Sequence, residues 1–240
     1  ETSCVVEMDP RLYDLLFDLN RDLKTTVAII THNLALAAVC ERVVQMRDGR
    51  IASVTPVAML GNSVGEYVAA TVAGLWTFSD AMALVAARGR AMREAPAGRM
   101  LAVSGDPGPV GPGLVVAVRS PGQVVVSGEV DAVAALEEEL RRRGVACRVL
   151  DTGGAFHSPL MRDAAVRLRD VLESTPTTRP RLPFVSNVTG DWADPDEVRS
   201  PEYWVRHLCA PVRLDLGVAA LAGVPTAVEL GPGTSMTRMV

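Results

Sequence analysis

The chain has 240 residues, of which 48% are hydrophobic, and a formal net charge of −4. This length allows one large domain or two small ones with a packed core. The acidic balance argues against a nucleic-acid binder, and no apolar run is long enough to span a membrane. The four cysteines are scattered and the N-terminus is acidic, so we predict no metal site, no disulfide framework and no secretory signal, and expect a cytoplasmic protein.

Residues 8–53 have an α-β-α-β pattern. Leucines recur at helical spacing over 12–19, and residues 27–30 form an apolar run rich in β-branched side chains, as in a buried strand. A second helix is predicted over 34–39 and a second strand over 43–46, followed by an Asp48-Gly49 turn.

The amino-acid sequence of this segment resembles the C-terminal end of the ATPase subunit of ABC transporters. It reads LLFDLNRDLKTTVAIITHNLALAAVCERVVQMRDGRI. The resemblance makes His32 the switch histidine, although Asn33 replaces the aspartate that is usual after it. The chain has no G-x-x-x-x-G-K-[ST] loop to hold a phosphate. We therefore expect residues 1–54 to be an α/β fragment without ATP hydrolysis.

The strongest chemical signal lies in residues 56–70, PVAMLGNSVGEYVAA. An apolar run over 57–60 leads into Gly61-Asn62-Ser63-Val64-Gly65, and a helical pattern follows. A G-x-S-x-G motif between a strand and a helix is typical of a nucleophile elbow, in which the serine hydroxyl is exposed at a sharp turn. Ser63 is thus a candidate nucleophile, and the N–H of Val64 is a candidate oxyanion donor.

The following residues predict a helix over 79–92, with Ser79 as its N-cap and Arg88 on its surface. Residues 99–152 predict a small ferredoxin-like α+β insertion, with strands at 100–103, 114–118, 123–127 and 146–150. An amphipathic helix is expected over 130–143, and Gly144 suits its C-terminus.

His157 follows the glycine-rich turn Gly153-Gly154 and precedes a predicted helix. A serine nucleophile needs a base, and histidine is the natural one near neutral pH. Together with the Ser63 elbow, His157 is the leading candidate. We interpret His207, in a sequence rich in aromatic residues, as a core or rim residue.

Residues 55–240 resemble the malonyl-CoA:acyl-carrier-protein acyltransferase family, in the form found in modular polyketide synthases. The matching stretches stand in family order: GNSVGEYVAA, LVAARGRAM, RSPGQVVVSG, CRVLDTGGAFHSPLM, LPFVSNVTG, PEYWVRHLCAPVRL and VELGPG. The resemblance implies an α/β fold with a parallel sheet flanked by helices. Its core would comprise 55–98 and 153–240, with the insertion at 99–152.

The family's chemistry implies a malonyl ester on Ser63, with His157 as general base and then general acid. A backbone carbonyl near Gly231 would orient His157, Val64 would donate to the oxyanion, and Arg88 would bind the free carboxylate. Phe156 matches the position at which a bulky ring disfavours an α-methyl branch, so malonyl is expected over methylmalonyl. The substrate is malonyl-CoA and the partner an acyl carrier protein bearing phosphopantetheine, with no metal and no tightly bound cofactor.

Several features depart from the family pattern. Asn62, expected beside the substrate, replaces a histidine, and Gly154 replaces another. The ABC-like piece stands where the family has an N-terminal loop with a second oxyanion donor, so activity would be impaired.

Three alternatives remain open. One is a serine esterase or thioesterase, with Asp131 or Asp151 orienting His157. The second is a non-catalytic, carrier-protein-binding or chimeric module. The third is nucleotide binding, without hydrolysis, through residues 1–53.

Overall fold

We analysed a computed structural model that describes residues 46–47, 50–51, 56–222, 224, 227, 229–230 and 236. The other residues, including most of the segment interpreted as ABC-like, lie outside this description. The chain divides into two compact units, residues 1–55 with 224–240 and residues 56–223. In the first unit, β1 (Met46–Arg47) pairs antiparallel with β2 (Arg50–Ile51), on either side of the predicted Asp48-Gly49 turn.

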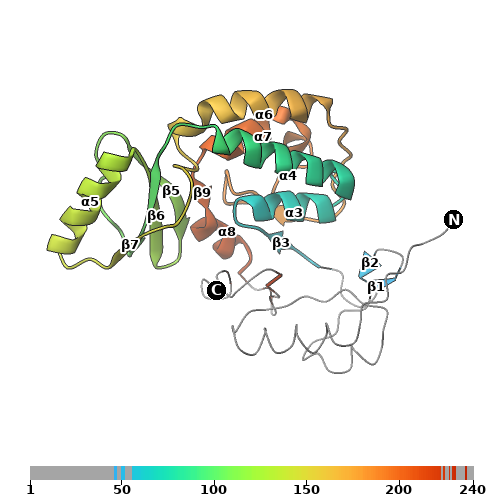
Figure 1. Cartoon of the computed structure of the whole chain (residues 1–240). Coiled ribbons are helices and arrows are strands. Elements are labelled where there is room, and N and C mark those ends of the chain that lie inside the picture. Colours follow the sequence, from blue (N-terminus) through green and yellow to red (C-terminus); the bar gives the residue numbers. More distant parts are fainter. Residues whose placement is uncertain are drawn as a thin grey trace, which may run out of the picture. The chain divides into compact units, whose positions relative to one another are not determined.

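The second unit contains a parallel strand pair beside a group of helices (Figure 1). Strand β3 (Met59–Leu60) pairs with β8 (Phe184–Val185), and Met59 aligns with Phe184. The helices are α3 (Val64–Val72), α4 (Phe78–Arg93), α6 (Arg162–Ser174), α7 (Pro201–Cys209) and α8 (Leu214–Ala220), with short 3₁₀ turns at Pro159–Met161 and Glu197–Arg199. The predicted strand at 57–60 is thus present but shorter.

Helix α4 begins at Phe78, one residue earlier than the sequence predicted, and its N-cap lies two residues before the predicted one. Its N-cap is Thr77, whose hydroxyl accepts a hydrogen bond from the Asp80 amide at 3.2 Å. The prediction of Ser79 as the cap is therefore wrong. Both residues can cap a helix, but the position of Thr77 satisfies an amide of the first turn, which the helix itself cannot do.

Aromatic side chains fill the core between these helices. The Tyr67 ring lies 4.5 Å from that of Trp204 and 5.6 Å from that of Trp76, measured between ring centroids. The Trp204 indole nitrogen donates to the Val198 carbonyl. Buried aromatic rings bring large apolar areas out of water, so this cluster fixes how α3 and α7 pack.

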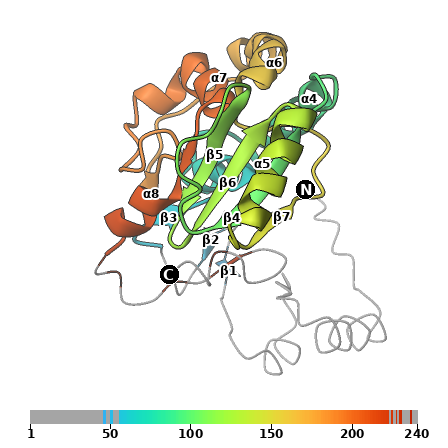
Figure 2. The same cartoon turned by 90° about the vertical axis from the view of Figure 1, so that its left-hand side faces the viewer.

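Residues 99–149 form a second layer, a sheet covered by one helix (Figure 2). The strand order is β7-β4-β6-β5-β9, with β4 (Arg99–Ser104), β5 (Leu114–Ser120), β6 (Gln123–Gly128), β7 (Cys147–Val149) and β9 (Val212–Arg213). Helix α5 (Val130–Arg142) buries Val133, Leu136 and Leu140 against this sheet. These residues recur every three to four positions and form one face of the helix.

The order β7-β4-β6-β5 is the order of a ferredoxin-like sheet, but the connection from β4 to β5 is a loop and not a helix. That loop, residues 105–113, contains three prolines, and three of its glycines have positive φ. A helix cannot accommodate this composition. The predicted fold class is confirmed: an α/β protein with helices flanking the sheet and a small α+β subdomain.

The fifth strand comes from much later in the chain. Strand β9 pairs parallel with β5, Val118 opposite Val212 and Arg119 opposite Arg213. The sheet of the insertion is therefore tied directly to the segment that follows α7. Among the described residues, no helix is both long and apolar enough to cross a lipid bilayer.

Candidate active site

Ser63 lies at a sharp turn between β3 and α3. Its backbone has φ 53° and ψ −108°, and only His157 shares a positive φ among the described residues other than glycine. A Cβ on Gly61 would lie 2.0 Å from the carbonyl carbon of Gly65, so glycine is required there. At Gly65 a Cβ would meet no described atom within 4 Å, so the close approach in this turn requires glycine only at position 61.

Strained residues of this kind cost about 1–3 kcal/mol each and persist where the surrounding structure holds them. In this turn the residue that holds the strained conformation is Asn187, two residues after the end of β8. Its side chain accepts a hydrogen bond from the Ser63 amide at 2.7 Å and donates one to the Gly61 carbonyl at 2.6 Å. Both ends of the turn are thus fixed by one buried amide.

The Ser63 hydroxyl meets two functional groups from distant parts of the chain. Its oxygen lies 2.8 Å from His157 Nε2, and an Arg88 Nη donates to it, also at 2.8 Å. Ser63 follows β3, Arg88 lies on α4, and His157 lies on the loop before α6. The three residues singled out from the sequence therefore come together at one oxygen atom.

The other ring nitrogen of His157 lies 3.1 Å from the Ala210 carbonyl oxygen, at the end of α7. This bond requires the proton on Nδ1, which leaves the lone pair of Nε2 directed at the serine. A backbone carbonyl in this role was predicted, but its assignment near Gly231, outside the described residues, was wrong. Asp131 and Asp151, the candidates of the esterase alternative, do not fill the role.

Burial, together with the neighbouring His207 and Arg88, lowers the pKa of His157 from its ordinary value of 6.5 to about 3. A neutral imidazole is the form that can accept a proton from serine. His157 is thus held in its basic form at neutral pH.

Arg88 is buried, with 8% of its surface exposed. Burial lowers the pKa of its guanidinium, since the charged form is poorly solvated there. Its carbon Cζ lies 5.6 Å from the centroid of the Tyr67 ring, and its Nε has no hydrogen-bond partner among the described residues. A desolvated guanidinium with an unused donor is suited to an anionic ligand.

The remaining predicted site residues lie around this centre. Val64 is the first residue of α3, where the helix provides no acceptor for the backbone amides. Asn62 is exposed within the elbow. Phe156, half-buried, precedes His157, and a Cβ added to Gly154 would lie 3.3 Å from its Cε1 atom. A side chain at position 154 would therefore press on the Phe156 ring.

Sequence reasoning missed a group of buried polar residues behind the elbow. Glu66 is fully buried in the first turn of α3. His207, interpreted from the sequence only as a core or rim residue, lies with its ring centroid 6.0 Å from that of His157. Asn187 and Tyr203 complete the group. The available signal was Glu66 itself, a charged residue on the otherwise apolar face of a helix.

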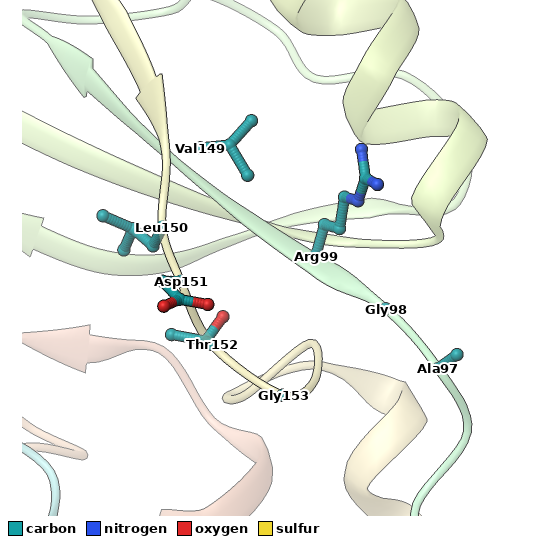
Figure 3. A pocket seen from close by; sticks show the side chains of 8 residues that line it. All are labelled: Ala97, Gly98, Arg99, Val149, Leu150, Asp151, Thr152 and Gly153. Atoms are coloured by element: carbon teal, nitrogen blue, oxygen red, sulfur yellow. The ribbon is translucent and has the colours of Figure 1, made fainter.

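A surface pocket of about 490 Å³ lies elsewhere, between the two chain segments that connect the insertion to the helical core (Figure 3). Residues 97–99 and 149–153 line it, and neither Ser63 nor His157 is among them. No group of three or more potential metal ligands occurs in the described part of the chain.

A scan against family models matches residues 7–240 to the acyl transferase domain. The chain belongs to the acyl transferase domain family. The match includes residues 8–53, and nothing in the comparisons supports the resemblance of that segment to an ABC transporter ATPase.

Named relatives agree with this family. Over 197 residues the chain is 41% identical to the spectinabilin polyketide synthase system protein NorB of Streptomyces orinoci, covering 78% of this chain and 9% of that protein. The acyl transferase domain of SpnD, solved with 2-(pent-4-yn-1-yl)malonyl, has 37% identity and a TM-score of 0.74 over 78% of this chain and 47% of its own. The malonyl-CoA:acyl carrier protein transacylase of Xanthomonas oryzae has 32% identity and a TM-score of 0.70, over 77% of this chain and 64% of its own.

The acyltransferase chain thus spans about half the length of the SpnD domain and a small fraction of the polyketide synthase. The acyltransferase family predicted from the sequence for residues 55–240 is confirmed.

Proposed function

We propose that this acyltransferase moves a malonyl group from malonyl-CoA to the phosphopantetheine thiol of an acyl carrier protein, through an ester on Ser63. The observation that carries the proposal is the Ser63 oxygen, 2.8 Å from both a neutral imidazole and a buried guanidinium. The imidazole supplies a base for acyl transfer, and the guanidinium selects a carboxylate-bearing acyl group.

In the first half-reaction, His157 Nε2 takes the hydroxyl proton while Ser63 Oγ attacks the thioester carbonyl carbon. The developing oxyanion receives a hydrogen bond from the N–H of Val64, at the start of α3. The carbon–sulfur bond then breaks, and the imidazolium returns its proton to the sulfur of the departing CoA. Ser63 is left as an ester.

The second half-reaction reverses these roles. His157 takes the proton of the phosphopantetheine thiol, the sulfur attacks the ester carbonyl, and the Ser63 oxygen leaves with the proton from the imidazolium. Because CoA and carrier protein bear the same thiol chemistry, no metal and no tightly bound cofactor are needed.

Arg88 would bind the free carboxylate of the malonyl group. The buried guanidinium has an unused Nε donor, and a carboxylate compensates its desolvation, whereas an acetyl group leaves it unpaired. Phe156 supports malonyl over methylmalonyl, because its bulky, half-buried ring directly precedes His157 in the chain and lies close to Gly154, 3.3 Å from where a Cβ on that residue would be. We place Asn62 at the rim of the same substrate site.

The cytoplasm remains the expected compartment, in keeping with the free thiols of Cys147 and Cys209. We also propose that the domain boundaries expected from the sequence separate the insertion, residues 99–152, from the catalytic core. The esterase alternative lacks support, because the Ala210 carbonyl occupies the position that its carboxylate would need.

The test is transfer to a carrier protein. Purified chain is mixed with malonyl-CoA and with either holo or apo acyl carrier protein, and the carrier is analysed by intact mass. We expect malonylation of the holo form only, lost in Ser63→Ala. Release of free malonate without carrier labelling would support the esterase, and carrier binding without any acyl transfer would support the non-catalytic module.

A further inference from the structure

The Glu66 carboxylate is fully buried, and both of its oxygens have polar partners. Oε1 accepts a hydrogen bond from the Tyr203 hydroxyl, on α7. Oε2 accepts one from the Asn187 amide at 2.8 Å and lies 3.1 Å from His207 Nε2, also on α7. A buried carboxylate is retained only when such partners compensate its desolvation.

Through Asn187, Glu66 is linked to the nucleophile. The backbone amide of Asn187 binds Glu66, and its side chain binds both Gly61 and Ser63. The elbow conformation, with its positive φ at Ser63, thus depends on a residue whose own position depends on Glu66.

Through α7, Glu66 is linked to the base. Tyr203 and His207 lie on the helix whose last turn leads to Ala210, and the Ala210 carbonyl orients His157. The segment that follows Ala210 also contacts Asn187. The backbone amide of Arg213 donates a hydrogen bond to the Asn187 carbonyl at 2.8 Å. The two halves of the Ser63–His157 pair therefore share one buried support.

We propose that Glu66 and Asn187 are positioning residues, which together set the distance and direction between Ser63 Oγ and His157 Nε2. They touch neither the hydroxyl nor the imidazole, so their effect is on geometry. A misplacement of about 1 Å between reacting groups can cost about 10²-fold in rate. This inference rests on the proposed Ser63–His157 chemistry and adds the residues that hold it.

The experiment uses phenylmethylsulfonyl fluoride, a small neutral reagent that needs neither Arg88 nor the carrier protein. Ser63 Oγ attacks its sulfur, fluoride leaves, and His157 takes the hydroxyl proton. The rate constant of labelling is followed by intact mass at a temperature at which every variant is folded by circular dichroism. Ser63→Ala defines the background.

The variants are Glu66→Gln, which is nearly isosteric, Asn187→Ala, the double variant and Tyr203→Phe, which keeps the ring and removes only the hydroxyl. The control is Val133→Ala, which destabilises the hydrophobic core of the insertion. This core does not include Ser63 or the residues that contact it. A purely structural role predicts that all variants with equal loss of melting temperature label at equal rates.

We expect labelling at least about tenfold slower in Glu66→Gln and in Asn187→Ala, and within twofold of the wild type in Val133→Ala. Tyr203→Phe should be slower by less than tenfold. The double variant should be about as slow as the slower single, because residues of one unit are not additive.

The proposal would be overturned if Glu66→Gln, Asn187→Ala and Tyr203→Phe, in so far as they fold, were labelled at the wild-type rate. It would also be overturned if the fold-decrease in labelling rate of the double variant were the product of the decreases in the two single variants. A folded wild type that is not labelled at all would instead contradict the proposed function, and this outcome is distinguishable because it appears without any substitution.

Discussion

At the scale of single residues, the Ser63 hydroxyl lies between two groups that act on it in opposite ways. In the proposed function His157 accepts its proton, whereas Arg88, which donates a hydrogen bond to its oxygen, stabilises negative charge there. In the proposed acyl-enzyme the ester oxygen would be a weaker acceptor, and the guanidinium would be free to turn toward a carboxylate. On this proposal the same arginine serves both the free enzyme and the acyl-enzyme.

A first prediction concerns this carboxylate. Arg88→Ala should slow loading from malonyl-CoA by about 10²–10³-fold, since a buried charged partner is lost. Loading from acetyl-CoA, which brings no carboxylate, should change less than tenfold. Arg90→Ala, an exposed arginine on the same helix, is the matched control. Equal losses for both substrates in Arg88→Ala would contradict the role.

A second prediction follows from the lowered pKa of His157, about 3 against an ordinary value of 6.5. Between these values the unfolded chain binds a proton that the folded chain does not, so stability falls as the pH falls. The stability contributed by neutral His157 is complete above pH 6.5 and is lost progressively below it.

The measurement is the free energy of unfolding in urea for the wild type and for His157→Gln, at pH 7 and pH 5. The wild type should lose about 2 kcal/mol more than the variant between these values, a difference that is insensitive to the exact folded pKa when it lies below 4. Parallel losses in the two proteins would mean that His157 is protonated in the folded state.

At the scale of elements, the sequence predicted the regular ones well and the junctions poorly. Strands β4, β5 and β6 and helix α5 confirm their predicted ranges, because alternating or helical apolar patterns set them. Strand β9 has only two residues, too few for any periodicity, yet it joins the insertion to the end of α7.

The residues of the candidate site likewise divide into those that a sequence pattern marks and those that it does not. Ser63 and His157 could be singled out because their residue types and turns carry chemistry, and the family resemblance added Arg88. Glu66 could have been noticed as a charged residue on an apolar helix face, but its role, like the roles of Asn187 and the Ala210 carbonyl, depends on which elements meet in space. A backbone carbonyl in particular has no residue type to mark it.

At the scale of the whole molecule, the family match over residues 7–240 covers nearly the entire chain. The separate origin expected for residues 8–53 rested on the similarity of one short sequence segment. The chain has no phosphate-binding loop that would give this segment a function in nucleotide hydrolysis. By contrast, the seven stretches from 55 onward resemble one family in order, and the fold and comparisons confirm that family. Ordered, repeated agreement along a chain is stronger evidence than one similar segment.

The central claim is that Ser63 carries the malonyl group as an ester, and intact-protein mass after brief mixing with malonyl-CoA tests it most directly. We predict a malonyl-sized gain in the wild type and none in Ser63→Ala. A gain that persists in Ser63→Ala, or no gain in a protein shown to be folded, would contradict the account.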